Sequence, residues 1–98
     1  MKKFLYLYTG GNPPTTAEAG RKMMQEWGAY FAKLSDKLDS GGPLGPHKSL
    51  GTKGGSQPNG YSILAAKDMD EAVALTKGHP HLANKGTIEI CEIQPIPQ

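Results

Sequence analysis

The sequence predicts an α+β fold in which six elements follow the order β-α-β-β-α-β. Two observations carry this prediction. Short runs of aromatic, aliphatic and β-branched residues mark the strands, and two N-capping signals are each followed by apolar residues at helical spacing. Glycine and proline pairs separate these segments. With 98 residues, the chain is predicted to form a single domain over residues 1–98.

The first third of the chain predicts a strand followed by a long helix. Residues 3–8 (KFLYLY) carry no polar residue from Phe4 onward, which is typical of a strand buried on both faces. Thr15 and Glu18 fit a capping box in which the Thr15 hydroxyl accepts the Glu18 amide. A helix is then expected over residues 16–38, because apolar residues recur at spacings of three and four: Met23, Trp27, Tyr30, Phe31, Leu34 and Leu38.

The middle of the chain is rich in glycine and proline and predicts two strands separated by a loop. Residues 40–43 (SGGP) break the helix. The second strand is expected over residues 44–50, where Pro46 suits an edge strand or a bulge. A polar loop over residues 51–59 then leads to a third strand, Gly60–Ala66 (GYSILAA).

The last third predicts a short helix and a fourth strand. Asp68 fits an N-cap with Glu71 three residues later, which is a second capping box. Gly78 and Pro80 are expected to stop this helix. Residues 87–93 (TIEICEI) alternate strictly and predict a strand. The inner face of the short helix is expected to comprise Met69, Ala72, Val73 and Thr76.

This order of elements is the split βαβ, ferredoxin-like plan: a four-stranded antiparallel sheet with two helices on one face. The helices leave the other face of the sheet without a cover, and pairing two sheets would cover it. A chain of this length buries only about 60–65% of the surface that it exposes when unfolded. We therefore expect a homodimer that forms through the sheet face.

Composition and charge exclude several classes of function. The net charge is only +2 and the lysines are dispersed, so the sequence predicts no binding of nucleic acid. No apolar run approaches the roughly 20 residues of a membrane helix, and the run in residues 1–9 is too short for a secretory signal, so we expect a cytoplasmic protein and no membrane partner. Residues 51–55 lack the spacing of a phosphate-binding loop, and no cofactor is expected.

Several short strings resemble the YCII-related family, in its DGPF-type branch. Residues 40–44 (SGGPL) resemble the family's G-G-P-L opening of the second strand. Residues 60–72 (GYSILAAKDMDEA) are similar to its passage from strand to helix. His79-Pro80 and residues 86–90 (GTIEI) resemble its ending. The resemblance spans nearly the whole chain and implies a dimeric α+β barrel, in which two ferredoxin-like subunits place their sheets face to face.

The resemblance implies small-molecule chemistry in a few relatives, through a histidine early in the first helix and an aspartate in an Asp-Pro that ends the second. This chain departs from that pattern. Its first predicted helix contains no histidine, with Gln25 in that region, and the Asp-Pro position is His79-Pro80. The Asp-Gly-Pro-Phe string is replaced by residues 54–59 (GGSQPN). The dyad therefore does not carry over, and catalytic residues stay unknown.

Three histidines are candidates for chemistry, because imidazole exchanges protons near neutral pH. His47 lies in a stretch rich in proline and glycine, where a surface position is the simpler interpretation. His79 and His81 flank Pro80 without an evident third ligand, so no metal site is predicted. We expect His79 to be cationic, because the C-terminal end of a helix favours a positive charge.

Glu89 and Cys91 alternate with two isoleucines on the last predicted strand. The isoleucines suit the face packed on the helices, so Glu89, Cys91 and Ile93 are expected to face the barrel interior or the partner subunit. A carboxylate there would lose water, which raises its pKa unless a cation pairs with it. An intersubunit ion pair or hydrogen bond explains Glu89 equally well. Cys91 is expected to be a small buried residue and not a nucleophile.

Two hypotheses of different classes follow. The first is a small-molecule-binding dimer, with enzymatic activity left open, whose cleft lies between the first helix and the sheet near the dimer interface. Trp27 and Tyr61 are its expected walls, and His47, His79 and Glu89 are its polar candidates. The second is a regulatory or protein-interaction module without catalysis, which the missing dyad favours. The simpler interpretation of the aromatic residues is that they belong to the core.

Overall fold

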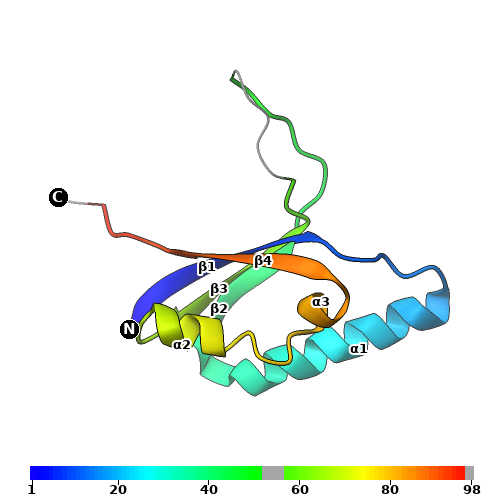
Figure 1. The fold of residues 1–98 in the computed structure, drawn as a ribbon, viewed down its shortest axis with the longest axis horizontal. Coiled ribbons are helices and arrows are strands. Elements are labelled where there is room, and N and C mark those ends of the chain that lie inside the picture. Colours follow the sequence, from blue (N-terminus) through cyan, green and yellow to red (C-terminus); the bar gives the residue numbers. More distant parts are fainter. Residues whose placement is uncertain (52–56, 97–98) are drawn as a thin grey trace.

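The structure is a computed structural model, and it describes residues 1–51 and 57–96. Strands and helices follow one another as the sequence predicts, with a turn of 3₁₀ helix and a second short helix added (Figure 1). The elements are β1 (Lys2–Gly10), α1 (Ala17–Leu34), η1 (Ser35–Lys37), β2 (Leu38–Pro43), β3 (Gly60–Ala66), α2 (Met69–Ala74), α3 (Pro80–Ala83) and β4 (Gly86–Glu92).

The four strands form one antiparallel sheet in the order β2-β3-β1-β4. β1 is central and pairs with β3 on one side and with β4 on the other. The helices all lie on one side of this sheet (Figure 1). This arrangement confirms the predicted α+β, ferredoxin-like fold, in which helices shield one face of an antiparallel sheet.

The core lies between the sheet and the helices. Alternate residues of β1 and β3 point into it, as the period of a strand requires. The other face of β1 carries Leu5 and Leu7, which are only half-buried. The expectation that β1 is buried on both faces is therefore wrong for a single chain. The buried apolar residues are Phe4, Tyr6, Tyr8, Tyr30, Leu34, Leu64, Ala66 and Ala72.

The second strand lies earlier in the chain than the sequence predicts. α1 ends at Leu34 rather than at residue 38, because Ser35 adopts a left-handed backbone with φ of 52°. β2 then starts at Leu38 and ends at Pro43, whereas residues 44–50 form no strand. Glycine permits this pairing, since a Cβ at Gly41 would lie 2.7 Å from the Tyr61 carbonyl oxygen.

The capping predictions are confirmed in one helix and shifted in the other. The Asp68 carboxylate accepts the Glu71 amide at 2.9 Å, as predicted, and Glu71 accepts the Lys67 amide at 3.0 Å. At α1 the cap is Thr16 and not Thr15, and its hydroxyl accepts the amide of Ala19 at 3.0 Å. The capping residue therefore lies one position later than expected.

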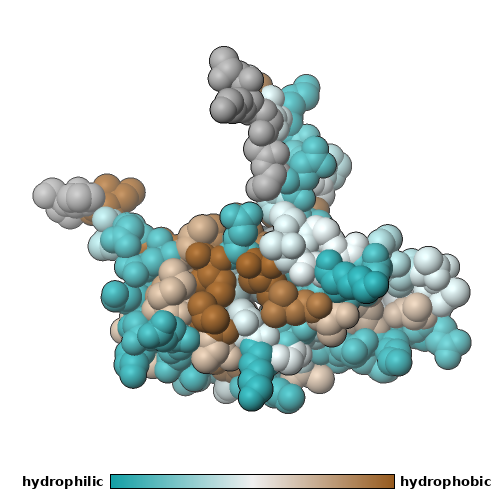
Figure 2. Space-filling view, viewed as in Figure 1, coloured by the Kyte–Doolittle hydropathy of each residue, from teal (hydrophilic) through white to brown (hydrophobic). Residues whose placement is uncertain are grey.

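The inner face of α2 is narrower than predicted. Ala72 is fully buried, but Met69 and Val73 are exposed. α2 has only six residues, so a single side of one turn reaches the core. Apolar side chains therefore come to the surface in the middle of the face shown in Figure 2, beside β4 and the short helices. The exposed Leu82 of α3 and the half-buried Ile88 belong to elements that border this area.

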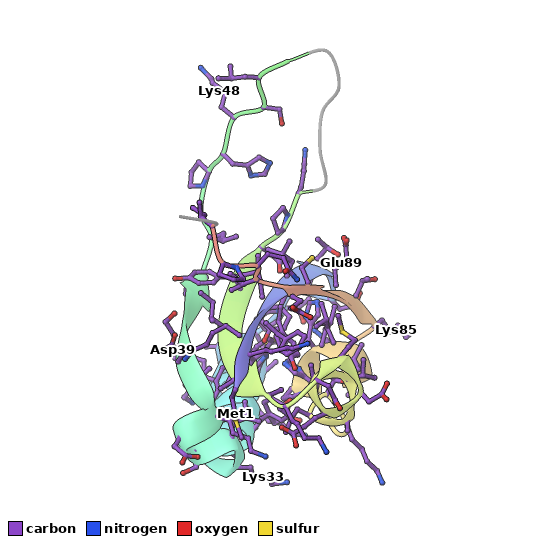
Figure 3. The ribbon with its side chains drawn as sticks, turned by 90° about the vertical axis from the view of Figure 1, so that its left-hand side faces the viewer. Met1, Lys33, Asp39, Lys48, Lys85 and Glu89 are labelled. Carbon is purple, nitrogen blue, oxygen red and sulfur yellow. The ribbon has the colours of Figure 1, made fainter. Side chains whose placement is uncertain are left out.

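The chain after β2 leaves the sheet on the side away from the helices (Figure 1). Residues 44–50 are exposed, and Lys48 lies far from the strands in Figure 3. Glu89 lies on the same open side of the sheet, opposite the helices (Figure 3). Of the helices that the described residues form, none is both long and apolar enough to cross a membrane.

Candidate functional site

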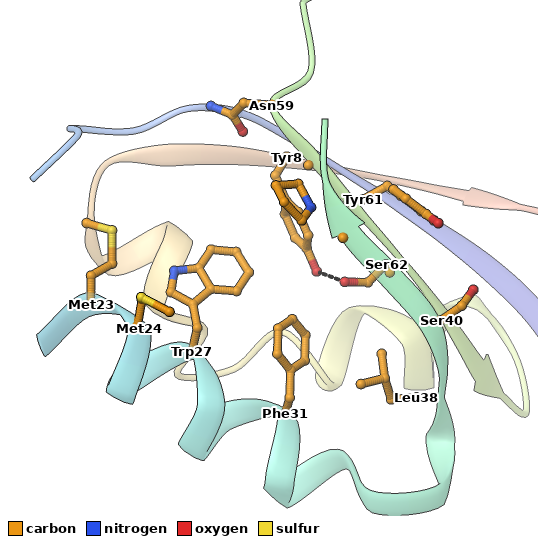
Figure 4. A pocket seen from close by; sticks show the side chains of 14 residues that line it. Tyr8, Met23, Met24, Trp27, Phe31, Leu38, Ser40, Asn59, Tyr61 and Ser62 are labelled. Carbon is orange, nitrogen blue, oxygen red and sulfur yellow. Dashed lines mark hydrogen bonds between the residues drawn. The ribbon is translucent and has the colours of Figure 1, made fainter. Parts of the chain in front are cut away.

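A cleft of about 630 Å³ lies between α1 and the β2–β3 side of the sheet (Figure 4). One wall comes from α1, and the other comes from the glycine-rich strand β2 and the start of β3. The lining residues are Tyr8, Met23, Met24, Trp27, Phe31, Leu38, Ser40, Gly41, Gly42, Pro43, Asn59, Gly60, Tyr61 and Ser62. A cleft of this size can hold a molecule of one or two rings.

The sequence builds the α1 wall through helical periodicity. Met23, Trp27 and Phe31 are four residues apart, so they form a single stripe that faces β2 (Figure 4). Trp27 packs edge-on against Tyr8, with ring centroids 5.2 Å apart. The opposite wall carries few side-chain atoms, because β2 contains glycines. A Cβ at Gly42 would meet no atom within 4 Å. The cleft therefore exists because bulky residues on α1 face small residues on β2.

The lining is mostly aromatic and aliphatic, with few polar groups. Methionine and aromatic side chains give a polarisable surface that suits a flat apolar ring. Apart from Tyr61, whose ring lies on the other face of the sheet, the lining residues with polar side chains are Tyr8, Ser40, Asn59 and Ser62. Ser62 is buried, with 1% of its surface exposed, whereas Ser40 is exposed. A polar group this buried fixes ligand orientation more strongly than an exposed one.

A line of buried polar groups extends behind the cleft. The Tyr8 hydroxyl donates to Ser62 Oγ at 2.7 Å (Figure 4). His79 Nε2 lies 3.4 Å from the Tyr8 hydroxyl oxygen, and His79 Nδ1 accepts the backbone amide of His81 at 3.0 Å. Burial raises the pKa of Tyr8, so this phenol stays protonated at neutral pH.

His79 is the most buried histidine of the chain, with 1% of its surface exposed. Its ring packs between the rings of Tyr8, Trp27 and Tyr30, whose centroids lie 5.1, 4.9 and 4.3 Å away. Burial, with a smaller contribution from His81, lowers the pKa of His79 from 6.5 to about 4. The imidazole is therefore neutral at physiological pH.

The expectation of a cationic His79 at a helix C-terminus is wrong. α2 ends at Ala74, five residues earlier, and α3 begins at Pro80. His79 is the N-cap of α3, and its ring nitrogen accepts an amide at the start of that helix. Pro80 takes the first helical position, where proline's fixed φ and missing N–H are favourable. The proline thus starts a new helix rather than ending α2.

A smaller cavity of about 320 Å³ adjoins the cleft and shares Met23, Trp27 and Asn59 with it. Its lining includes His81 and Asn84. His81 Nε2 donates to the Thr9 carbonyl oxygen at 2.8 Å, which fixes the orientation of that ring. A Cβ at Gly86 would lie 2.2 Å from His81 Nε2, so glycine at this position makes room for the ring.

The structure brings together some of the residues that the sequence analysis selected. Trp27 lines the cleft, as predicted. Tyr61 is also among the lining residues, but its ring points away from α1, towards the open face of the sheet, and does not form a wall (Figure 4). His79 packs against Trp27 from the core side without lining the cleft. His47 is exposed in the segment after β2, and Glu89 is exposed on the open face of the sheet. These two side chains therefore lie apart from the cleft in a single chain.

The sequence analysis missed Ser62. A signal was present, because Ser62 is the polar residue among the inward positions Gly60, Ser62, Leu64 and Ala66 of β3. Cys91 also differs from expectation, since it is exposed in a single chain rather than buried. Among the described residues, no group of three or more histidine, cysteine or acidic side chains could hold a metal ion.

No protein-family model matches this chain, and no curated protein sequence matches it significantly. Its fold is similar to a solved structure of 5-chloro-2-hydroxyhydroquinone dehydrochlorinase (TftG) from Burkholderia phenoliruptrix AC1100, in complex with 2,5-dihydroxybenzoquinone. The sequences are 18% identical, the TM-score is 0.61, and the match covers 96% of this chain and 94% of that one. At this identity, the match shows that the two chains share the ferredoxin-like α+β fold.

Proposed function

We propose that this chain binds a small, flat, largely apolar molecule, such as a substituted aromatic ring, in the cleft between α1 and β2. The single observation that carries this proposal is the composition of the lining. Tyr8, Trp27 and Phe31 supply aromatic surface, and Met23 and Met24 supply adaptable apolar surface. Surfaces of this kind favour planar apolar ligands through edge and face contacts with the rings.

The solved structure of similar fold supports the same chemical class. Its bound molecule, 2,5-dihydroxybenzoquinone, is a flat ring that carries oxygen substituents. The cleft described here offers aromatic walls and a few hydroxyl groups, which suit such a ring. The proposal concerns binding and names no reaction.

The test uses the indole N–H signal of Trp27, the only tryptophan in the chain. We expect 2-acetylnaphthalene to shift this signal in a ¹H–¹⁵N spectrum in a saturable manner and to raise the melting temperature, because a ligand that binds only the folded state stabilises it. A panel of single-ring aromatics defines the preferred size. If no member of the panel moves the Trp27 signal, the proposal is wrong.

A matched pair of variants locates the binding. Met24 lines the cleft and is 76% exposed, so Met24→Ala removes ligand contacts with little effect on the core. We expect about fivefold weaker binding, since losing part of one apolar contact costs about 1 kcal/mol. Met69, which is exposed and not among the lining residues, gives the control Met69→Ala. Equal effects of the two substitutions would place the ligand elsewhere.

We also propose that the chain forms a homodimer through the open face of the sheet. That face carries Leu5 and Leu7 on β1, which pair across the ladders with Ile63 and Tyr61 on β3. These side chains are only half-buried in one chain, so a second sheet would remove apolar surface from water. Tyr61 is among the residues that line the cleft, but its ring alternates with the inward Ser62, so the proposed interface lies across β3 from the ligand.

Sedimentation equilibrium tests the dimer. We expect Leu7→Lys to shift the protein towards the monomer, because it places a charge on the proposed apolar interface. Val73→Lys, on the helical side of the molecule, serves as the control and leaves the assembly unchanged. A monomeric wild type at every concentration would contradict the proposed interface while leaving the cleft within one chain intact.

We further propose that the chain is a single domain of the YCII-related family, DGPF-type branch, and that it acts in the cytoplasm. The order and spacing of the short strings at residues 40–44, 60–72 and 86–90 support the family. Alignment of close homologues tests this proposal. Retention of those strings together with the Asp-Gly-Pro-Phe sequence in near relatives would support it, and their absence would count against it.

A further inference from the structure

We propose that Ser62 presents its hydroxyl proton to the cleft, so that the site selects ligands that place a hydrogen-bond acceptor, such as a carbonyl oxygen, beside it. This inference rests on the proposed function of the cleft and names the chemistry of one end of its ligand. It follows from the direction of the hydrogen bonds that join His81, His79, Tyr8 and Ser62.

The direction of this chain is fixed at its buried end. The backbone amide of His81 can only donate, and it donates to His79 Nδ1 at 3.0 Å. A neutral imidazole that accepts at one ring nitrogen carries its proton on the other. The neutral His79 therefore bears its proton on Nε2.

The next step sets the Tyr8 hydroxyl. His79 Nε2 carries a proton, so it cannot accept one from the Tyr8 oxygen that lies 3.4 Å away. The other neighbour of that oxygen is Ser62 Oγ at 2.7 Å, a normal distance for a hydrogen bond between hydroxyls. The Tyr8 proton therefore lies towards Ser62 Oγ, and Tyr8 acts as the donor in this pair.

The last step leaves the Ser62 proton available. Ser62 Oγ accepts from Tyr8, and no acceptor for the Ser62 proton is found in the described part of the chain. Ser62 is 1% exposed and lines the cleft, where its hydroxyl meets that of Tyr8 between the strands and α1 (Figure 4). A buried donor without a protein acceptor favours a ligand that supplies one.

Two planar probes of nearly equal shape test this selection. 2-Acetylnaphthalene carries a carbonyl oxygen, and in 2-isopropenylnaphthalene a CH₂ group replaces that oxygen. Equilibrium dialysis measures the affinity of each probe for the wild type and for Ser62→Ala. For each protein, the affinity for the ketone is divided by the affinity for the hydrocarbon, and this ratio is compared between the wild type and Ser62→Ala. The free probes are the same in both measurements, so their different hydration cancels.

We expect the ketone-to-hydrocarbon affinity ratio to fall by roughly three- to tenfold in Ser62→Ala, the fold-change of one hydrogen bond. The affinity for the hydrocarbon should stay within about twofold, since the aromatic walls are unchanged. An unchanged ratio with intact binding would overturn the role of Ser62 and leave the proposed function standing. If neither probe binds the wild type, the proposed function fails and this inference fails with it.

Tyr8 has a positioning role, and a third probe tests it. In Tyr8→Phe, the Ser62 oxygen loses the donor that occupies one of its lone pairs, so Ser62 becomes a better acceptor. We expect the affinity for 2-naphthol, which can donate, to rise at least about twofold relative to 2-acetylnaphthalene. A merely structural role of Tyr8 would weaken both probes equally and leave their ratio unchanged, which would overturn the directional argument.

An infrared measurement on the wild type avoids the risk that a buried substitution impairs folding. The carbonyl stretch of 2-acetylnaphthalene labelled with ¹³C at its carbonyl carbon should lie at a lower wavenumber in the complex than in hexane, because hydrogen bonding weakens the C=O bond. A hexane-like frequency in the bound state would show that the carbonyl accepts no hydrogen bond and would overturn the proposal.

Discussion

Substitution of His79 by asparagine provides a quantitative test of the buried network, through the dependence of stability on pH. The pKa of His79 is 6.5 in the unfolded chain and about 4 in the folded protein. The folded value is the lower one, so the unfolded chain binds the proton first as the pH falls. Stability is therefore complete above pH 6.5 and is lost progressively as the pH falls towards 4.

The size of the stability loss follows from the shift in the pKa of His79. One pKa unit corresponds to about 1.36 kcal/mol. Between pH 8 and pH 5, the unfolded chain becomes protonated at His79 while the folded protein does not. This difference lowers the free energy of unfolding by about 2 kcal/mol. Below pH 4, both states bind the proton and the loss levels off at about 3 kcal/mol.

Urea unfolding at pH 8, 7, 6 and 5, followed by Trp27 fluorescence, measures this change. The wild type should lose about 2 kcal/mol more over that range than His79→Asn does. His47→Asn, a like substitution at an exposed histidine, should keep the wild-type slope. Equal slopes in the wild type and His79→Asn would refute the reasoning. If His79→Asn fails to fold, an NMR titration of His79 in the wild type gives the same information, since its signal should not titrate above about pH 5.

Three further predictions concern backbone space, capping and the open sheet face. In urea unfolding, Gly28→Ala should raise the free energy of unfolding by about 1 kcal/mol, because the new Cβ in α1 meets no atom within 4 Å. Gly86→Ala should lower the free energy of unfolding by at least about 2 kcal/mol, because its Cβ collides with His81. Asp68→Ala should cost about 1 kcal/mol through loss of the α2 cap. Cys91, which is exposed in a single chain, should react slowly with a thiol reagent in the proposed dimer and quickly in the variant Leu7→Lys. Equal rates would argue against burial of Cys91 at the proposed dimer interface.

Much of the fold was predictable because local signals and tertiary packing agree. Alternation in β4 and the Asp68 cap point to the elements that form. The second strand was misplaced because its residues, LDSGGP, have low β propensity. β2 is an edge strand held by pairing with β3, a long-range interaction that no local pattern records. The apolar Leu44 and Leu50 favoured a strand over residues 44–50, which lie outside the sheet.

The candidate site was predictable only in its α1 wall. Trp27 belongs to a helical stripe, and such a stripe must face the sheet, so one wall followed from periodicity. The polar part did not follow, because His79 and Tyr8 are 71 residues apart in the sequence and meet only in the folded core. Histidine next to proline suggested an exposed helix end, whereas the short α3 turns His79 inwards. The polar network therefore depends on tertiary burial rather than on spacing in the sequence.

Nuclear Overhauser contacts in the complex with 2-acetylnaphthalene test the location of the ligand most directly. The account predicts contacts from the naphthyl protons to the side chains of Trp27 and Phe31, with the carbonyl end of the probe beside Ser62. Contacts confined to Leu7 and Ile63 on the open sheet face, or none to the α1 wall at saturating ligand, would contradict it.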